Sequence, residues 1–424
     1  MKSYGFLILC SILLLATSCS KKTTALALTQ SQEVSNIASI RSEKKEQCDC
    51  YDPNNYAPDD RYPQYQDVKY INTNVHYPNA TNLKYNYTGQ TAVTYSHDLI
   101  NNANRKLIKN KKMNLPEGNT TPVYSTGYQY RLAKDPSTSS GLAVYVDQDD
   151  EHWDYIKKGK GRNNYNKALI KRFAKNEDTQ LNIFAMAYSP DSLARKGFKG
   201  GSAGIALGNS VKIAGIVADG KGSGWKFATL LNHEIGHVFG LRHSWYKNDG
   251  CDDTPPNANC WGQTETGKCA GVISNNLMDY NNQQMAITPC QIGVVHKNMH
   301  KAGTKQRGLV IKDWCEYDSR KTMAVDDDFQ LDRAVDMKGD IEVLDGASLR
   351  LSCRVHMPKG SKIIVHPGGT LLLNGAYLHN DCGDTWDGIE ILTKGDKVGI
   401  VEYAGTVKIE DMVGDPPSDN NKMK

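Results

Sequence analysis

Three histidines and one glutamate lie close together near the middle of the chain, with a spacing that suits a metal site. They belong to the string His233-Glu234-Ile235-Gly236-His237-Val238-Phe239-Gly240-Leu241-Arg242-His243. His233 and His237 are four residues apart, so on a helix they would lie on one face and could share an ion. If that helix continued, His243 would lie about 9 Å farther along the axis and on another face. We therefore expect the chain to turn at Gly240, which permits a left-handed backbone.

These residues predict a catalytic zinc site rather than a structural one. Three imidazole nitrogens leave one coordination position open, whereas structural zinc sites are closed by four protein ligands. Glu234 directly follows the first ligand. A carboxylate there can take the proton of a metal-activated water as that water attacks a peptide carbonyl. The alternative, a helix with surface histidines, would suit a lone histidine pair better than the full string. We therefore expect hydrolysis of peptide bonds with zinc as cofactor and Glu234 as general base.

A second motif, Asn275-Asn276-Leu277-Met278-Asp279-Tyr280, lies downstream. Together with the histidine string it resembles the metzincin metallopeptidases, in which a methionine in a tight turn lies beneath the zinc. The resemblance implies structural support from Met278, which by itself would be interpreted as core packing. In several metzincin families a tyrosine two residues after this methionine approaches the metal, and Tyr280 has that position. The resemblance thus implies that Tyr280 stabilises the oxyanion.

Within the metzincins, the chain is most similar to the pappalysin family over roughly residues 65 to 305. The similarity is carried by Gly250-Cys251-Asp252-Asp253-Thr254-Pro255, by Leu277-Met278-Asp279-Tyr280 and by Thr288-Pro289-Cys290-Gln291. It implies a two-part catalytic domain in which the substrate adds as a strand to the sheet edge, for which residues 204–217 are the candidate. It also implies calcium near the loop after the third histidine, where Asp253 and Thr254 lie, so Ca²⁺ is a possible second cofactor.

Two departures from the family pattern concern disulfides and specificity. Gln284 stands near the place where the family commonly has a cysteine, and Cys290 follows where a glycine is frequent. The pairing implied by the resemblance is crossed, joining Cys251 to Cys269 and Cys260 to Cys290. Residues 281–284 are Asn, Asn, Gln and Gln, where members that cleave before arginine carry an aspartate. The sequence therefore gives no support for a preference for basic residues.

The pattern of apolar residues predicts strands first and a long helix afterwards. We expect strands at 68–76, 128–132, 141–146, 181–188 and 210–217, and helices at 96–113, 166–175, 225–239 and 291–301. This order favours a mixed sheet backed by helices. The expected fold class is α+β. Its metzincin-type catalytic domain, residues 65–320, combines the mixed sheet, the active-site helix and a Met-turn subdomain.

Residues 326–424 have a different sequence pattern from the rest of the chain, and this pattern predicts a small all-β module. The run 346–351 recurs at 368–373 and, more loosely, at 404–409. Short strands between glycine turns at this repeat length are typical of a β-solenoid, with a small β-sandwich as the alternative. Because so few coils would be only marginally stable by themselves, we expect a disulfide between Cys353 and Cys382 to stabilise them.

The N-terminus predicts export. Lys2 precedes an apolar run and small residues, as in a secretory signal over residues 1–18, and the run is too short to span a bilayer. Cys19 follows small residues and resembles a bacterial lipoprotein cleavage site, so we expect lipidation there, with simple secretion as the alternative. Residues 19–64 are polar and are interpreted as a tether or pro-segment. The expected location is the cell surface or periplasm as a lipoprotein, or the medium.

Export also makes the cysteines candidates for disulfides. The candidates are Cys251, Cys260, Cys269, Cys290, Cys353 and Cys382. Cys48, Cys50 and Cys315 then remain, and at most two of them can pair. A thiolate of Cys48 or Cys50 could hold the open zinc position and keep the enzyme latent, as in some metzincins that include pappalysin relatives. The alternative is one disulfide to Cys315 and one free or intermolecular thiol.

The overall charge and composition indicate which classes of binding partner to expect. The net charge is +4, from 51 basic and 47 acidic residues, without a dominant basic stripe, so nucleic acid is not expected. The partners expected are protein or peptide substrates, and a membrane only through a lipid anchor. A second hypothesis is a surface adhesion or binding protein whose C-terminal β module is the main functional part.

Overall fold

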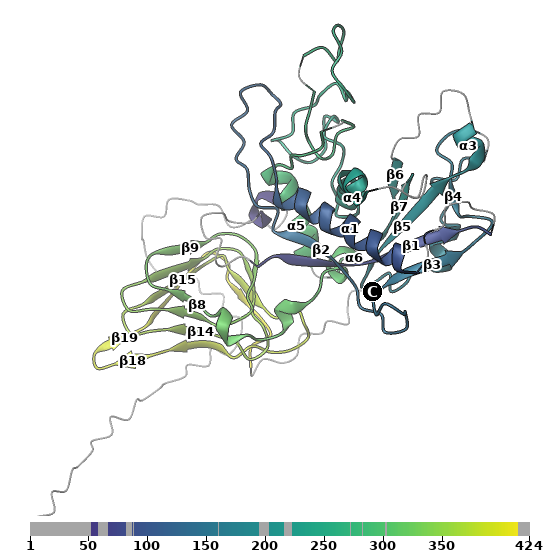
Figure 1. The fold of residues 1–424 in the computed structure, drawn as a ribbon. Coiled ribbons are helices and arrows are strands. Elements are labelled where there is room, and N and C mark those ends of the chain that lie inside the picture. Colours follow the sequence, from purple (N-terminus) through teal and green to yellow (C-terminus); the bar gives the residue numbers. More distant parts are fainter. Residues whose placement is uncertain are drawn as a thin grey trace, which may run out of the picture.

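The computed structural model describes residues 52–57, 67–81, 87, 89–159, 161–194, 203–215, 223–271, 273–281, 283–301 and 303–413. The predicted signal (1–18), Cys19, Cys48 and Cys50 lie outside these residues. Figure 1 shows a sheet with helices packed on it, followed by a stack of strands in the C-terminal part. Within the described residues, no helix is both long and apolar enough to cross a membrane.

The first part is built on a seven-stranded sheet. Its strands are β1 (Lys69–Asn79), β2 (Tyr128–Leu132), β3 (Val144–Gln148), β4 (Asp154–Tyr155), β5 (Leu181–Tyr188), β6 (Ala203–Ala206) and β7 (Ser210–Ala214). The order is β2-β1-β5-β7-β6, with β3 beside β1 and β4 beside β5. Neighbours are parallel except for β6, which runs antiparallel to β7 at the edge. The sheet is therefore mixed, as predicted.

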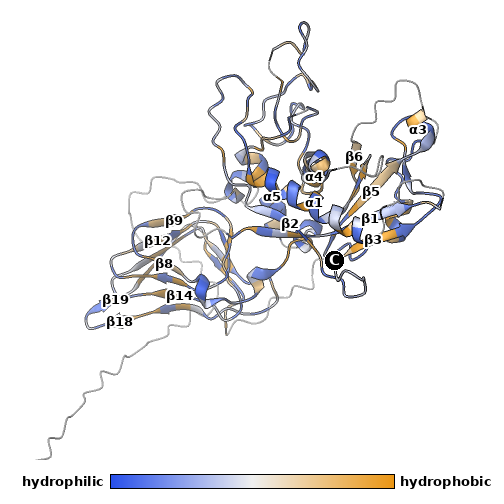
Figure 2. Ribbon diagram, viewed as in Figure 1, coloured by the Kyte–Doolittle hydropathy of each residue, from blue (hydrophilic) through white to orange (hydrophobic). Residues whose placement is uncertain are grey.

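Helices cover both faces of this sheet. α1 (Gly89–Ile108) and α4 (Gly224–Val238) share one hydrophobic core with the strands, in which Val75, Leu99 and Leu231 are fully buried. α2 (Ala168–Phe173) packs on the other face against β5, whose residues are buried along its whole length. Figure 2 shows the hydrophobic character of β5. The remaining helices are α3 (Pro190–Ala194), α5 (Pro289–His300) and α6 (Lys305–Gly308).

Most differences from the predicted elements lie at their ends. β2 and β5 have the predicted bounds, and β7 is shorter than predicted, ending at Ala214. α1 begins at Gly89 and ends at Ile108, not at 96 and 113 as predicted. Its end has a tertiary cause, because the side chain of Asn110 donates to the carbonyls of Tyr124 and Ile287 at 3.0 Å. These bonds direct the chain away from the helix axis.

The C-terminal part consists of three four-stranded parallel sheets, visited in turn by the chain. The larger strands are β8 (Met323–Val325), β9 (Phe329–Leu331), β11 (Ile341–Val343), β12 (Ser348–Leu351), β13 (Arg354–His356), β14 (Lys362–Val365), β15 (Thr370–Asn374), β16 (Tyr377–His379), β17 (Gly388–Ile391) and β20 (Ile400–Ala404). Two-residue strands are β10 (Val335–Asp336), β18 (Thr393–Lys394), β19 (Lys397–Val398) and β21 (Lys408–Ile409). The sheet orders are β17-β14-β11-β8, β20-β15-β12-β9 and β10-β13-β16-β21.

The predicted internal repeat is partly wrong. Strands β12 and β15 pair in register, with Ser348 opposite Thr370, as the recurrence of 346–351 at 368–373 predicts. The third copy was placed at 404–409, but the strand opposite Thr370 begins at Ile400. Residues 408–409 belong to a different sheet, where they pair with β16. The antiparallel hairpin β18–β19 precedes β20 and lengthens that part of the chain, which displaces the repeat.

Buried charges join the two parts. The carboxylate of Asp336 accepts hydrogen bonds from the Lys69 ammonium of β1 and from the Arg354 guanidinium, the latter at 2.9 Å. His300 of α5 and Arg307 lie 3.5 Å from the same carboxylate. These side chains are almost fully excluded from solvent. The C-terminal strands are therefore fixed to the seven-stranded sheet by ion pairs and not only by the covalent chain.

A short segment before the sheet also lies in this junction. The 3-10 turn η1 (Pro53–Tyr56) packs on α5, and the Tyr56 ring lies 5.9 Å from that of His300. The Asn55 carbonyl accepts the amide of Ala334 at 2.9 Å, and the Ala57 carbonyl accepts the Arg333 guanidinium at 2.8 Å. This piece of the predicted tether is thus part of the packed structure.

The disulfide pairing predicted from the sequence is wrong. The bonds are Cys251–Cys290, Cys260–Cys269 and Cys315–Cys382. These bonds exclude the predicted pairs Cys251–Cys269 and Cys260–Cys290. They also exclude the predicted disulfide between Cys353 and Cys382. Because Cys315 is bonded to Cys382, it does not pair with Cys48 or Cys50. Cys353 is disulfide-bonded as well. Cys315–Cys382 ties the two parts together, which residue spacing alone could not reveal.

Candidate active site

Helix α4 carries the first two histidines, and its ends define their position. The Ser223 side chain accepts the amide of Trp225 at 3.2 Å and caps the start of the helix. At the other end, the Gly240 amide donates to the His237 carbonyl and the Leu241 amide donates to the Gly236 carbonyl. This is a Schellman ending, which requires a left-handed residue, and Gly240 has φ +94°. The turn predicted at Gly240 is present.

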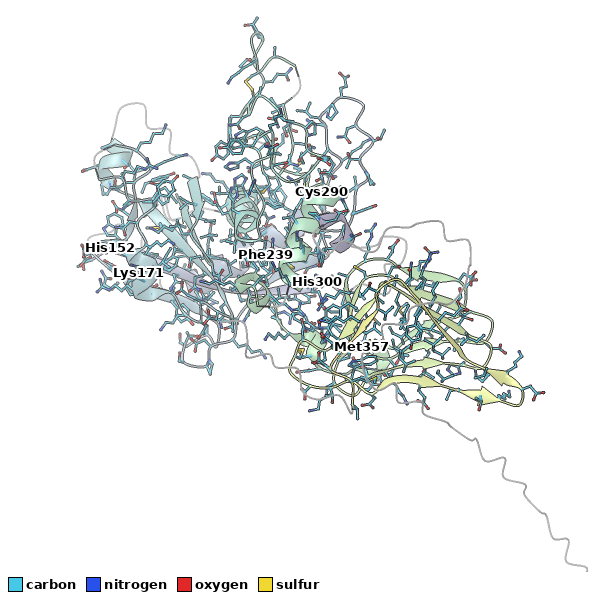
Figure 3. All side chains as sticks on the ribbon, turned by 180° about the vertical axis from the view of Figure 1, so that it is seen from behind. His152, Lys171, Phe239, Cys290, His300 and Met357 are labelled. Atoms are coloured by element: carbon cyan, nitrogen blue, oxygen red, sulfur yellow. A yellow bond between two sulfur atoms is a disulfide. The ribbon has the colours of Figure 1, made fainter. Side chains whose placement is uncertain are left out.

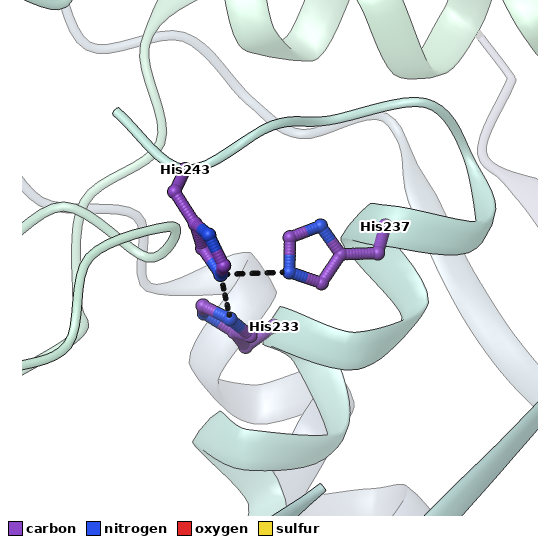
Figure 4. Close-up of side chains that lie close together, drawn as sticks. All are labelled: His233, His237 and His243. Atoms are coloured by element: carbon purple, nitrogen blue, oxygen red, sulfur yellow. Dashed lines mark hydrogen bonds between the residues drawn. The ribbon is translucent and has the colours of Figure 1, made fainter. Parts of the chain in front are cut away.

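The turn brings the three histidines together (Figure 4). The His243 Nε2 atom lies 3.3 Å from Nε2 of His233 and 3.0 Å from Nε2 of His237. The Nδ1 atoms face backbone carbonyls, that of Leu277 for His233 and that of Leu241 for His237, each at 2.8 Å. Because Nδ1–H donates to a carbonyl, Nε2 is left as a bare acceptor in both rings.

This donor set fits a tetrahedral zinc ion. The bare Nε2 atoms of His233 and His237 both face Nε2 of His243, and a cation among the three would bind all of them. Nitrogens bound to tetrahedral zinc at about 2.0–2.1 Å are about 3.3 Å apart, close to the observed separations. Burial lowers the pKa of His233 to about 3 and that of His243 to about 4, so both are neutral ligands at pH 7. His233, His237 and His243 are thus able to hold a metal ion.

Glu234 lies between this group and the edge strand β6. Its side chain is buried, and burial raises its pKa to about 8, opposed by the backbone amide of Ala206 and the charge of Lys157. A Cβ on Gly204 would lie 2.6 Å from both Cγ and Oε1 of Glu234. The strand and the carboxylate are therefore in direct contact at a position that only glycine can occupy.

Met278 lies beneath the histidine pair. It is fully buried, and a Cβ on Gly236 would lie 2.8 Å from its Sδ atom. Gly236 separates His233 from His237 on the helix, so the methionine packs on the backbone that carries both ligands. This arrangement agrees with the supporting role inferred for Met278, and it explains the glycine within the histidine string.

Tyr280 and Trp245 border the third ligand. The Tyr280 ring lies 4.9 Å from that of His243 and 5.9 Å from that of His233, and the side chain is half exposed. Burial, followed by the nearby charge of Glu234, raises the Tyr280 pKa, so its hydroxyl keeps its proton. The Trp245 ring stacks on His243 at 3.9 Å and lies 4.5 Å from Tyr280. Trp245 was not found by sequence reasoning, although it follows the string by two residues.

Hydrogen bonds between the loops support these residues from behind. The Asp279 carboxylate accepts from Ser244 at 2.5 Å and from Asn257 at 2.7 Å, joining the loop after His243 to the Met-turn. The Gln284 amide donates to the Asp279 carbonyl and lies 3.4 Å from Nδ1 of His233. Asp279 and Gln284 stand in or near the motif around Met278, but the sequence did not reveal these contacts, because several of them connect segments that are distant in the chain.

The residues considered for calcium are engaged with protein groups. The Asp253 carboxylate accepts the Thr288 hydroxyl at 2.7 Å and the Cys290 amide at 3.0 Å, at the start of α5. The Thr254 hydroxyl donates to Asp249 at 2.5 Å. Two other groupings of metal-binding side chains, around Cys290 and around Cys382, each include a sulfur that is in a disulfide. Among the described residues, the three histidines are thus the grouping in which no ligand atom belongs to a disulfide.

Comparison with known proteins agrees with the site. Residues 110–303 match the model of metallopeptidase family M12B, reprolysin-like. No curated protein matches the chain in sequence. Among solved structures, mature mirolysin of Tannerella forsythia in complex with a cleaved peptide shares 17% identity, covering 57% of this chain and 96% of that chain, with a TM-score of 0.37. Mirolysin in complex with compound 9 is similar at 17% identity over 57% and 96% of the two chains, with a TM-score of 0.40.

With TM-scores this low, the structural likenesses carry no inference about this chain. The matched family span contains the three histidines, Glu234 and Met278. This span is similar to the reprolysin-like metallopeptidases, and with the three-histidine site it defines the class of protein as a zinc metalloendopeptidase.

Proposed function

We propose that the chain is an exported, pappalysin-type zinc endopeptidase in which Glu234 is the general base. The observation that carries the proposal is the contact geometry of α4. Three Nε2 atoms converge beside a buried carboxylate that faces the edge of the sheet. A bound zinc ion would supply Lewis acidity, lowering the pKa of water and polarising the scissile carbonyl.

Two side chains around this position, Glu234 and Tyr280, would perform the proton transfers and stabilise the oxyanion. Glu234 accepts a proton from the attacking water and passes it to the leaving amine as the bond breaks. Tyr280 has a protonated hydroxyl beside His243 and donates a hydrogen bond to the oxyanion. The buried surroundings of Glu234 keep its basicity high, since few other groups compete to stabilise its charge.

The edge strand β6 is the proposed place for the substrate backbone. It is the last strand in the sheet order of the described residues, and its Gly204 contacts Glu234. An extended peptide added to this edge would pass the general base with its carbonyls and amides paired to β6. The candidate edge, predicted as residues 204–217, contains most of β6 (203–206) at the edge and also β7, which lies one strand farther in.

The test is the variant Glu234→Ala. It is expected to keep stoichiometric zinc, because all three ligands remain, and to lose proteolysis of an unstructured protein such as casein. Zinc content is measured by atomic emission, and cleavage by gel and mass spectrometry. Exposed Glu265→Ala serves as the matched control and should cleave like the wild type. Undiminished turnover by zinc-loaded Glu234→Ala would disprove this mechanism.

We further infer that the signal peptide (1–18) is removed and that Cys19 is lipidated, since small residues precede this cysteine and a polar segment follows it. A fatty-acid probe should label the wild type and not Cys19→Ala. A mature N-terminus at another residue, found by mass spectrometry, would refute lipidation. Latency through Cys48 or Cys50 remains part of this proposal, and raised activity of Cys48→Ala or Cys50→Ala in the uncut form would support it.

We also infer that the C-terminal part is a β-solenoid, since its parallel sheets are built from every third strand once the β18–β19 hairpin is set aside. Its burial of Asp336 against Lys69 supports a role as a fixed part of the enzyme. The competing hypothesis, in which this module is an adhesin, predicts that binding to matrix does not require the Glu234 side chain. Binding of whole cells to matrix that is unaffected by Glu234→Ala would favour it.

A further inference from the structure

Three aromatic side chains cluster beside the third histidine, on the loop that follows it and on the Met-turn. They are Trp245, Tyr246 and Tyr280, here called the aromatic patch. The Trp245 ring stacks on His243 with the centroids 3.9 Å apart, and it lies 4.5 Å from the Tyr280 ring and 5.5 Å from the Tyr246 ring. Tyr246 is 55% exposed and Tyr280 is 49% exposed. The rings therefore contact one another and the histidine, and they also present apolar surface to solvent.

The contacts of the patch place it next to the position of the cleaved bond. Trp245 lies directly against the ligand His243, and the Tyr280 ring is also 5.9 Å from that of the ligand His233. The edge strand β6 borders the same group through its contact with Glu234. A peptide that lies along β6 and brings a carbonyl to the three Nε2 atoms therefore has the patch beside its scissile bond.

Packing explains Trp245 better than it explains Tyr246. The Trp245 ring lies nearly parallel to the imidazole of His243, at an angle of 14°, so it holds the plane of that ligand. The Tyr246 ring lies 6.0 Å from that of His243, and the residue is more exposed than buried. An exposed ring that touches only other rings adds little to the stability of the free protein, whereas exposed apolar patches mark binding sites. Tyr246 is therefore better explained by a bound partner.

The charges near the patch favour a neutral partner over a cationic one, although aromatic rings can bind either. Lys247 directly follows Tyr246 and is exposed, and the positive charge of Lys157 acts on the carboxylate beside the ligands. The carboxylates of the adjoining loops, Asp249 and Asp279, accept hydrogen bonds from protein groups. A cationic side chain would thus meet like charges, with both of these carboxylates engaged. A neutral aromatic ring has no such cost.

We propose that Trp245 and Tyr246 select an aromatic side chain of the substrate next to the scissile bond. The inference rests on the proposed peptidase function and names its substrate class, polypeptides with Phe, Tyr or Trp at one position beside the cleaved bond. The incoming ring packs on Tyr246 and on the edge of Trp245, which removes apolar surface from water on both sides. Tyr280 borders the same space and keeps its role at the oxyanion.

The size of the preference follows from the shape of the patch. Because the patch is an open surface, it covers only part of a substrate ring, and phenylalanine should raise kcat/KM about tenfold over alanine. Leucine should lie between the two, since it buries apolar area without a ring–ring contact. Salt should change the ratio little, because no charge pair is involved, whereas a preference based on charge would weaken as salt is raised.

The experiment uses quenched fluorescent peptides of neutral sequence with one cleavable bond, whose position is confirmed by mass spectrometry. Phe, Leu, Ala or Arg is placed in turn at each position flanking the bond. Wild-type enzyme should prefer Phe to Leu and Leu to Ala at one of these positions, with Arg no better than Ala. The readout is the Phe-to-Ala ratio of kcat/KM, in which a general change of activity cancels. Tyr246→Ala should lower this ratio by about fivefold or more, and Tyr246→Phe should keep it.

The matched control is Tyr403→Ala, which makes the same change at an exposed tyrosine of β20 in the C-terminal part. Figure 3 shows this part, where Met357 is labelled, apart from Phe239 at the end of α4. Tyr403→Ala should keep the wild-type ratio.

A second readout does not depend on turnover. An uncleaved Phe peptide is titrated by calorimetry into the zinc-loaded, inactive Glu234→Ala enzyme. Its Kd should rise by about fivefold or more when Tyr246→Ala is added, and should stay unchanged when Tyr246→Phe is added.

The outcomes separate this inference from the proposed function. Equal Phe-to-Ala ratios in the wild type and in Tyr246→Ala would overturn the inference and leave the peptidase intact, as would a preference for Arg over Phe at that position. A ratio lowered equally by Tyr246→Ala and Tyr403→Ala would also reject the patch as the site of recognition. Absence of cleavage of every peptide and of casein by the zinc-loaded wild type would overturn both.

Discussion

Gly204 on β6 lies against the carboxylate of Glu234, so that a methyl group at this glycine would come within 2.6 Å of the Glu234 Cγ and Oε1 atoms. The glycine carbonyl also faces the buried Tyr155 hydroxyl at 3.4 Å, which holds the strand in place. Neither the strand nor the carboxylate can shift without the other. The position of the proposed general base is therefore determined by the same strand that is proposed to receive the substrate.

Gly204→Ala should lower kcat by about tenfold to a hundredfold, because displacement of a reacting group by about 1 Å has effects of this size. Zinc content and melting temperature should change little, since no ligand is touched. Gly262→Ala is the matched control, as a Cβ there meets nothing within 4 Å. Steady-state kinetics with zinc analysis check this. An unchanged kcat would show that Glu234 is not held by Gly204.

Tyr280→Phe should lower kcat by about tenfold or more with KM little changed, by analogy with removing one oxyanion donor. The ring remains, so its contacts with His243 and Trp245 are preserved. Tyr246→Phe, whose ring lies 6.0 Å from that of His243 and which is exposed, is the control. Kinetics identical to those of the wild type would reduce Tyr280 to a packing residue.

Asp336→Asn should destabilise the whole protein by about 3–5 kcal/mol, because Lys69, Arg307 and Arg354 would remain buried with less negative charge beside them. Asp345→Asn removes an exposed partner of Lys397 and should cost about 0–1 kcal/mol. Urea unfolding followed by tryptophan fluorescence gives both values. Equal stabilities of the two variants would show that the junction does not depend on the Asp336 carboxylate.

Stability should fall as the pH is lowered from about 6.5 to about 4. Burial lowers the pKa of His296 to about 4, that of His379 to about 3, and that of His300 well below its usual value. In this window the unfolded chain binds protons that the folded chain does not, so the free energy of unfolding falls by about 1.4 kcal/mol per pH unit for each histidine.

Urea unfolding of the chelator-treated protein at several pH values checks this, with zinc absent so that its release does not contribute. In His379→Gln the free energy of unfolding should fall less steeply with decreasing pH, by about the contribution of one histidine. A free energy of unfolding that does not change over this pH range would show that these histidines gain protons in the folded state.

The ligands could be inferred from the sequence because their geometry is local. His233 and His237 lie on one helix, and the glycine that turns the chain toward His243 is in the same string. Buried strands such as β5 were also predictable, because every residue in it is buried and its apolar run shows this directly.

Contacts between distant segments could not be predicted in this way. Trp245, Gly204 and Gln284 have roles that depend on which loop or strand lies beside them. The cysteines illustrate the same limit, because the pairing of Cys315 with Cys382 depends on where two domains meet, not on sequence spacing. The end of α1 was misplaced for the same reason, as the bonds of Asn110 go to loops far along the chain.

The burial of Lys69 against Asp336 has a consequence for the order of assembly. Lys69 lies at the start of the first strand, and its partner is synthesised 267 residues later. The central sheet therefore holds an unmatched charge until most of the chain has been made, and contacts this distant in sequence slow folding. A chain that stops before Asp336 would leave Lys69 of the first strand without this partner even though every zinc ligand is present. The order of synthesis thus makes completion of the sheet that carries the site wait for the first strands of the C-terminal part.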